Sequence, residues 1–219
     1  MEDYYRKRIL EYEKIYYRDD TIRLKEQEKI ADAIKRFLKN KAVIEVAAGT
    51  GYWSEILSES ASKIMITDLV SETLGLAKTK KYKCPVEFKK EDAYSLSFQD
   101  NTFSGGMANL WFSHIPKERI NDFFNEFHRV LKNGAIVFMS DNNFDGKVGG
   151  KIIKPTGDFN TYKIRRLNDG SKHKILKNYY YKEELFNIFS KFSHSFSGKN
   201  IFYGQKFWYV YYKLNKSKS

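Results

Sequence analysis

The sequence predicts an α/β fold built around a mainly parallel sheet. Short apolar runs alternate with amphipathic segments between residues 42 and 141, as strands joined by crossover helices do. The runs are apolar almost throughout, which is typical of strands buried on both faces of a sheet. Gly49 and Gly51 follow the first run, where open α/β sheets bind ligands. We therefore expect a ligand site at this turn.

The first forty residues are expected to be helical. Ile30, Ile34, Phe37 and Leu38 recur at helical spacing and form one apolar stripe, the pattern of a helix that packs on a core.

The core then alternates strands and helices along the chain. Strands are predicted over residues 42–47, 63–68, 86–89, 103–109 and 135–140. Helices are predicted over residues 52–60, 71–80 and 117–131. Ser71 is expected to cap the second helix, and Gly134 follows the third.

The pattern changes after Asp141. Residues 162–167 and 173–179 flank "NDGS", whose Asp-Gly pair indicates a hairpin turn. This predicts a β-hairpin insertion that caps a site. A helix over residues 183–192 and strands over 195–202 and 206–214 then complete a seven-stranded sheet with an antiparallel last strand.

The composition argues against a disulfide-bonded, membrane-spanning or secreted protein. The 219 residues carry a formal charge of +12 and one cysteine, Cys84, so no intrachain disulfide is possible. No apolar run reaches the ~20 residues of a membrane span, and the N-terminus lacks the pattern of a secretory signal. We expect a cytoplasmic protein with no membrane partner. The charge suits an anionic partner or a solvated lysine-rich surface.

Two kinds of nucleotide compete for the glycine turn. A dinucleotide fold needs G-x-G-x-x-G, but Ser54 stands at the third glycine position. A nucleoside sulfonium has no pyrophosphate and needs only a close backbone. Glu45 fits a pattern E-x-G-x-G-x-G in which Ala47 replaces the first glycine. Asp68 ends the second strand, where an acid can accept hydrogen bonds from ribose hydroxyls.

The chain resembles the class I S-adenosylmethionine-dependent methyltransferases at this point. Their motifs are matched in order by "VIEVAAGTGYW", "ITDL", "EDAYSL", "NLWFSHIP" and "RVLKNGAIVF", between residues 43 and 141. The resemblance implies a Rossmann-like fold and S-adenosylmethionine as cofactor, with S-adenosylhomocysteine as product and no metal. An alanine at position 47 is expected to fit the turn if its φ is negative. The implied cofactor-binding residues are Tyr16, Glu45, Ala47, Gly49, Gly51, Tyr52, Trp53, Asp68, Leu69, Asp92, Ala93, Tyr94 and Asn109.

The resemblance extends to both ends of the chain. These ends are similar to those of a bacterial subgroup of the family that methylates small molecules. We expect one domain over residues 1–219. Its parts are an N-terminal helical lid (1–40), a cofactor-binding core (41–141), an insertion with the hairpin (142–181), and a closing helix and strands (182–214).

The expected reaction is an SN2 methyl transfer to an O or N of a small-molecule acceptor. Alignment supplies most of the catalysis in such a reaction. His114 follows the fourth strand and is the candidate general base, or it only orients its loop. Trp111, His114 and Asp141 are expected in the acceptor pocket. The sequence indicates no oligomeric state.

Two other functions are open. The charge also suits an RNA or DNA methyltransferase, although Asn109-Leu110-Trp111-Phe112 lacks both prolines of the N-P-P-Y signature of amino-directed DNA enzymes. Nucleic acid is the less favoured acceptor. The third function is a non-catalytic partner subunit that keeps the cofactor fold.

Overall fold

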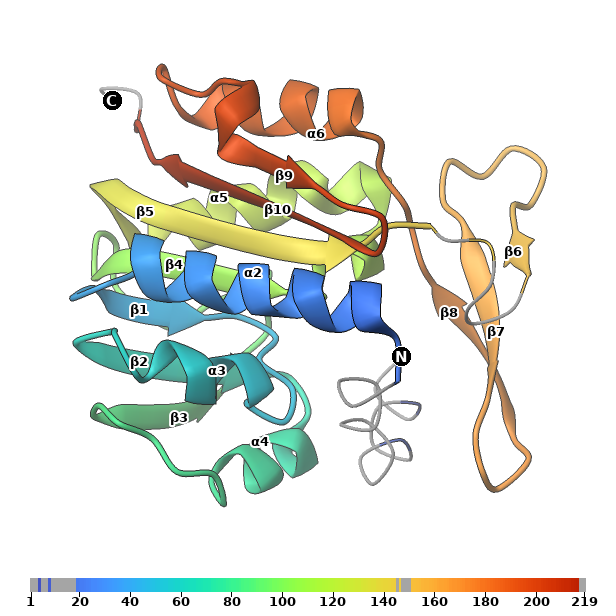
Figure 1. Ribbon diagram of the computed structural model, residues 1–219, viewed down its shortest axis with the longest axis horizontal. Helices are drawn as coiled ribbons and strands as arrows, with labels where there is room; N and C mark the ends of the chain where they lie inside the picture. The colour runs from blue at the N-terminus through green and yellow to red at the C-terminus, as the bar shows by residue number, and fades with distance from the viewer. Residues whose placement is uncertain (1–3, 5–7, 9–18, 145, 147–150, 217–219) are drawn as a thin grey trace.

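A seven-stranded sheet with helices on both faces forms the body of the molecule (Figure 1). The computed structural model describes Tyr4, Arg8 and residues 19–144, 146 and 151–216. The strand order is β3-β2-β1-β4-β5-β10-β9, and β10 runs antiparallel to both neighbours. The strands are β1 Ala42–Glu45, β2 Lys63–Asp68, β3 Val86–Lys90, β4 Phe103–Asn109, β5 Leu131–Asn142, β9 Ile201–Tyr203 and β10 Phe207–Lys213. This confirms the predicted fold class.

Five α-helices flank this sheet in the described part of the chain. They are α2 Thr21–Phe37, α3 Tyr52–Leu57, α4 Ser71–Ala77, α5 Ile120–Arg129 and α6 Lys182–Phe189. Short 3₁₀ turns lie at Phe112–His114, Lys117–Arg119, Ser190–Phe192 and Gly198–Asn200. Among the described helices, none combines the length and apolarity needed to cross a bilayer.

The alternation of side chains along each strand builds two cores. Val43 faces the layer of α2, α3 and α4, where Ile34 and Leu57 are fully buried. Its neighbour Ile44 faces the layer of α5 and α6 and joins a cluster rich in phenylalanine. Successive strand residues point to opposite faces, so a continuous apolar run supplies both cores.

Several predicted boundaries differ from the structure, two of them for clear local reasons. The helix over 117–131 begins as a 3₁₀ turn and ends at Arg129, because Leu131 already pairs with Phe103 as the first residue of β5. The cap of α4 is Val70 rather than Ser71, and no side chain caps this helix.

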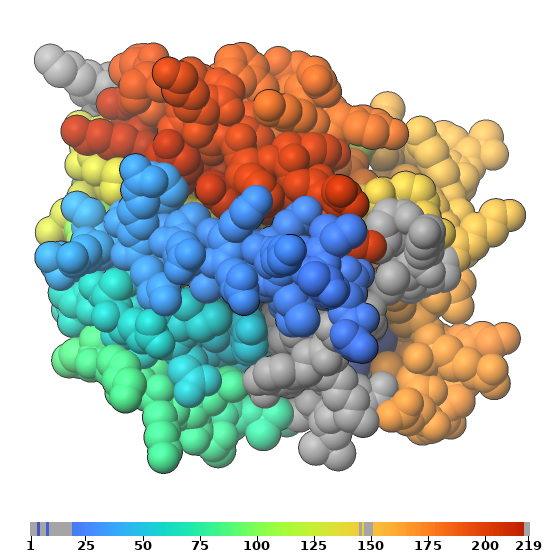
Figure 2. Space-filling view, viewed as in Figure 1, coloured from blue at the N-terminus to red at the C-terminus, as the bar shows by residue number. Residues whose placement is uncertain are grey.

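A separate three-stranded sheet follows β5. It consists of β6 Ile152–Ile153, β7 Tyr162–Arg166 and β8 Lys172–Leu176, all antiparallel. The hairpin of β7 and β8 confirms the predicted hairpin, whereas β6 was not predicted. The segment forms one side of the molecule, drawn in orange at the right of Figure 2. Tyr4 packs against it, because it clusters with Leu167 and Ile175.

Helix α2 is fastened to the turn between β9 and β10. The buried carboxylate of Glu26 accepts hydrogen bonds from the backbone N–H groups of Gln205, Lys206 and Phe207, at 2.7, 3.0 and 2.9 Å. A Cβ at position 204 would collide with this carboxylate, so Gly204 is required by the close approach.

Candidate functional site

A cavity of about 330 Å³ lies at the carboxyl ends of the central strands. The segments that follow β1, β2, β3 and β4 form its wall, and Leu176 of β8 closes one side. Nine predicted site residues line it: Ala47, Gly49, Asp68, Leu69, Asp92, Ala93, Tyr94, Trp111 and His114. Seven that were not predicted also line it: Val70, Thr73, Glu91, Leu110, Pro116, Arg119 and Leu176.

The missed residues differ in how far the sequence could have revealed them. Val70, Glu91 and Leu110 adjoin predicted residues, and the strand ends already point to them. Arg119 and Leu176 come from later segments with no motif of their own, and only the folded chain brings them to the cavity.

The glycine turn has left-handed backbone at alternate residues. The φ angles are +54° at Ala47, +60° at Gly49 and +76° at Gly51. The condition of a negative φ under which an alanine was expected to fit is therefore not met at Ala47. The chain keeps the glycine conformation here despite the alanine Cβ, which costs roughly 1–2 kcal/mol.

Asp68 is held in a fixed orientation at the end of β2. Its Oδ2 accepts a hydrogen bond from the Gly49 N–H and its Oδ1 from the Val70 N–H, both at 2.8 Å. Burial raises the pKa of Asp68, while these two amides oppose the rise. The carboxylate lies on the cavity wall, where its oxygens can also accept hydrogen bonds from a ligand.

Glu45 lies beneath the turn rather than on the cavity wall. Its carboxyl group is buried and accepts a hydrogen bond from the Ser54 hydroxyl. Burial raises the pKa of Glu45 to about 8, and the nearby charge of Asp68 adds to the rise. At neutral pH Glu45 is therefore largely protonated, which lowers the cost of burying it.

Four other predicted cofactor residues also lie off the cavity wall. Gly51 precedes α3, and a Cβ there would meet the Tyr82 hydroxyl. Tyr52 and Trp53 pack in the α2–α4 core and contact each other edge to face.

Asn109 points toward β5 instead, because its Oδ1 accepts a hydrogen bond from the Ser140 hydroxyl at 2.8 Å. Tyr16 lies outside the described residues.

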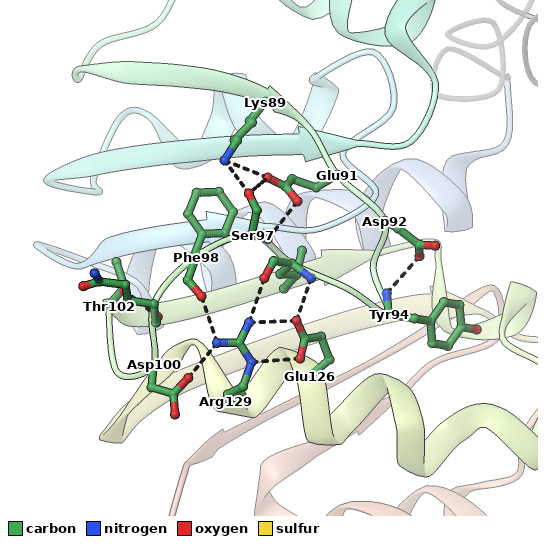
Figure 3. Close-up of polar contacts among 12 residues, drawn as sticks. Lys89, Glu91, Asp92, Tyr94, Ser97, Phe98, Asp100, Thr102, Glu126 and Arg129 are labelled. Atoms are coloured by element: carbon green, nitrogen blue, oxygen red, sulfur yellow. Dashed lines mark hydrogen bonds and ion pairs between the residues drawn. The ribbon is translucent and has the colours of Figure 1, made fainter.

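The loop after β3 carries Asp92 and Tyr94 to the cavity. Asp92 Oδ1 accepts from the Tyr94 N–H at 2.9 Å. Behind the loop, the Arg129 guanidinium donates to the carbonyl oxygens of Leu96 and Phe98, at 2.7 and 2.8 Å, and it pairs with Glu126 (Figure 3). Helix α5 thereby holds the loop in place.

His114 lies on the side of the cavity that is bounded by β8. Its Nδ1 donates to the Leu176 carbonyl at 2.8 Å, so in the neutral ring the lone pair lies on Nε2. Burial, then the charge of Lys177, lower the pKa of His114 to about 3, although Asp141 opposes them. His114 is therefore neutral at physiological pH.

Asp141 forms a buried ion pair instead of lining the cavity. Lys177 Nζ lies 3.1 Å from its Oδ1 and also donates to the Ser113 hydroxyl at 2.6 Å. The Ser113 N–H donates to Asp141 Oδ2 at 2.8 Å. The pair thus joins β5, the insertion and the 3₁₀ turn that bears His114.

Two polar groups on the cavity wall have no hydrogen-bond partner among the described residues. They are the Tyr94 hydroxyl and the Trp111 indole N–H, both buried. Buried polar groups are nearly always hydrogen-bonded, so a bound ligand is the natural partner. Within the described part of the chain, no group of three or more His, Cys, Asp or Glu side chains has the arrangement of a metal site.

Comparisons with known proteins agree with this geometry. A family model described as "Methyltransferase domain" matches residues 43–134, whereas no curated protein matches the sequence. The chain is similar to the DhpI–SAH complex, with 20% identity, 99% of this chain and 96% of that chain covered, and a TM-score of 0.73. It is similar to the PH0226 protein from Pyrococcus horikoshii OT3, with 19% identity, coverage of 94% and 99%, and a TM-score of 0.67.

A third similar structure is an S-adenosylmethionine-dependent methyltransferase from Clostridium acetobutylicum ATCC 824. It shows 16% identity, coverage of 97% of this chain and 99% of that chain, and a TM-score of 0.63. The match identifies residues 43–134 as a methyltransferase domain, and the whole chain shares its fold with structures such as this S-adenosylmethionine-dependent methyltransferase.

Proposed function

We propose that this methyltransferase transfers the methyl group to an O or N of a small-molecule acceptor. The observation that carries the proposal is the cavity itself, which is bounded by β8 on the side of His114. Its volume of about 330 Å³ lies at the lower end of the range of small-molecule sites. A site of this size suits a small acceptor better than a polymer.

The donor half of the cavity suits S-adenosylmethionine. Asp68 has acceptor positions for the ribose hydroxyls, and the left-handed turn at Gly49 brings backbone close to the ligand. Asp92 and the unpartnered Tyr94 hydroxyl lie on the same wall. Asp92 and Asp68 also give this half a negative lining that complements a sulfonium cation.

The reaction needs little from the protein beyond alignment. When bound, S-adenosylmethionine supplies a methyl group on a positively charged sulfur. A lone pair of the acceptor forms the new bond to that carbon, the pair of the C–S bond stays on sulfur, and the acceptor loses its proton. Holding the two molecules in line converts a bimolecular reaction into an effectively unimolecular one.

His114 is placed to orient the acceptor. The Leu176 carbonyl fixes the ring, and the low pKa of about 3 keeps the ring neutral. We propose that Nε2 accepts a hydrogen bond from the acceptor's hydroxyl or amine and takes its proton as the new bond forms. Trp111, beside it on the wall, is the proposed side of the acceptor pocket.

Calorimetric titration tests the donor half. S-Adenosylmethionine and S-adenosylhomocysteine are expected to bind the purified protein, and Asp68→Asn is expected to weaken both by about tenfold through a lost charge-assisted hydrogen bond. Asp32→Asn, an exposed change on α2, is the matched control. Equal affinity of the two variants would contradict the role of Asp68. Mass-spectrometric detection of methyl gain in a metabolite extract tests the acceptor class.

A further inference from the structure

The positive charge of the chain is concentrated in the small sheet. Residues 151–177 contain eight Lys and Arg against two Asp, a formal charge of +6 out of +12 for the whole chain. Residues 1–18 do not balance this charge, because they hold five basic and four acidic side chains. About one eighth of the sequence therefore carries half of the net charge.

Five exposed cations of this sheet are not in ion pairs within the part of the chain that the structure describes. None of Lys151, Lys154, Arg166, Lys172 and Lys174 forms an ion pair with a residue in the described part of the chain. In the body of the molecule, by contrast, several cations are paired.

Examples from the body are Lys35 with Glu59 at 3.3 Å, Arg129 with Asp100 at 2.6 Å and Lys206 with Asp20 at 3.3 Å.

The two acids within residues 151–177 accept hydrogen bonds from nearby residues. Asp158 accepts from the Tyr162 hydroxyl, and Asp169 accepts from Ser171.

The strand register places like charges directly opposite each other. Arg166 pairs with Lys172 across β7 and β8, so their side chains share one face of the sheet. Like charges in such a pair destabilise a hairpin. The Arg166–Lys172 pair therefore does not stabilise the fold. Its effect is to raise the positive electrostatic potential of this surface.

The positive potential of the small sheet extends toward the acceptor side of the cavity. Strand β8 runs from exposed Lys172 to Leu176, which lines the cavity. Four steps of about 3.3 Å place these residues roughly 13 Å apart, within the screening length of about 30 Å at 0.01 M salt but beyond that of about 8 Å at physiological salt, so this charge acts on the cavity mainly at low salt. On the inner side, the charges of Lys177 and Arg165 are both felt at His114, since each lowers the pKa of its ring.

The cavity therefore lies between a negative and a positive wall. Asp68 and Asp92 line the donor half, where Glu91 is already paired with Lys89, and the cations of the small sheet stand beyond His114. We propose that the β6–β8 sheet attracts and selects a small acceptor that carries a negative charge, such as a carboxylate or phosphate group. This proposal rests on the proposed function, and it adds the chemical class of the acceptor.

A labelling experiment tests the acceptor class. The full-length protein is incubated with S-adenosylmethionine labelled in its methyl group and a small-molecule extract, and the products are separated by anion exchange. Label is expected in the retained, anionic fraction. Label only in neutral or cationic products would overturn this inference and leave the proposed function intact. Label absent from every small molecule, or found only in added RNA, would overturn both.

Charge reversal tests the role of the sheet with the labelled acceptor from the anionic fraction. Arg166→Glu/Lys172→Glu is expected to lower kcat/KM about tenfold at low salt, with kcat unchanged, because electrostatic steering acts on association. The matched control, Lys39→Glu/Lys132→Glu, makes the same charge change before β1 and at the start of β5, on the opposite edge of the parallel strands. It is expected to have less than a twofold effect. An equal loss in both variants, or a loss that high salt does not remove, would overturn the inference.

Discussion

The ammonium group of Lys177 lies 3.1 Å from the carboxylate of Asp141, and 7% and 1% of their side chains are exposed. The pair connects the insertion to β5, directly behind the 3₁₀ turn that bears His114. A buried pair of this kind contributes little net stability, yet removing one partner leaves an uncompensated charge. Its evident effect is to fix the position of β8 over the cavity.

Lys177→Met is therefore expected to destabilise the fold by about 3–5 kcal/mol. Asp141→Asn combined with Lys177→Met is expected to recover part of this loss, because no buried charge then remains. Urea unfolding of both single variants and the double variant gives the coupling energy. Additive losses would show that the two side chains do not act as a pair.

We expect kcat to be independent of the protonation of His114 between pH 7.5 and 5.5. Its pKa of about 3 lies far below the free value of about 6.5, so kcat should not fall as the pH is lowered from 7.5 to 5.5. His114→Asn should lower kcat by about 10²-fold or more and leave S-adenosylmethionine affinity unchanged in calorimetry. An acidic limb near pH 6.5 in the parent enzyme would contradict the neutral ring.

The raised pKa of Glu45 predicts how the stability of the fold depends on pH. Its pKa is about 8 in the folded state and about 4.5 when exposed, so the folded state binds more protons between these values. Stability should therefore fall as the pH rises from about 5 to 8. Glu45→Gln should flatten this fall and raise Tm at pH 9, as calorimetric scans at pH 6 and 9 would measure. An identical pH dependence in the variant would assign the effect to other groups.

Ala47→Gly tests the strain at the turn. The substitution relieves about 1–2 kcal/mol of left-handed strain and adds about 0.4–1 kcal/mol of unfolded-state entropy. We expect the net effect to lie between zero and about 1.6 kcal/mol of stabilisation, with affinity for S-adenosylmethionine retained. Thermal unfolding with and without the ligand measures both. A clear destabilisation would mean that the Ala47 methyl group packs favourably enough to outweigh the strain.

Arg129→Met tests the support of the loop that carries Asp92. The variant loses the hydrogen bonds to Leu96 and Phe98, and the loop should then sample more conformations before binding. We expect about a tenfold weaker affinity for S-adenosylmethionine, since a partly populated binding-competent state reduces apparent affinity in proportion. Lys35→Met, which removes a surface ion pair on α2, is the control and should bind normally.

The sequence predicts the body of this fold well because its signals are local. Apolar runs such as residues 63–68 and 103–109 match β2 and β4 at both ends. Since parallel strands end at one edge of a sheet, the positions of Asp68 and Trp111 at two strand ends are enough to assign both residues to one cavity.

The remaining features depend on contacts between distant segments. Nothing near Asp141 in the sequence announces that Lys177 folds back to it, so the acid was expected in the acceptor pocket. The left-handed φ of Ala47 also has no local signature, because it is imposed by the turn that the surrounding strand and helix require.

The fastening of α2 by Glu26 has a consequence for the order in which the protein can fold during synthesis. The amides that Glu26 binds, and the buried side chains of Trp208 and Tyr212, all belong to the hairpin of β9 and β10. A nascent chain that has been made only to residue 200 leaves β5 as an open edge, which invites pairing with other chains. The cooperative structure is therefore complete only after residues 201–213 have emerged from the ribosome, and until then the growing chain depends on protection of that edge.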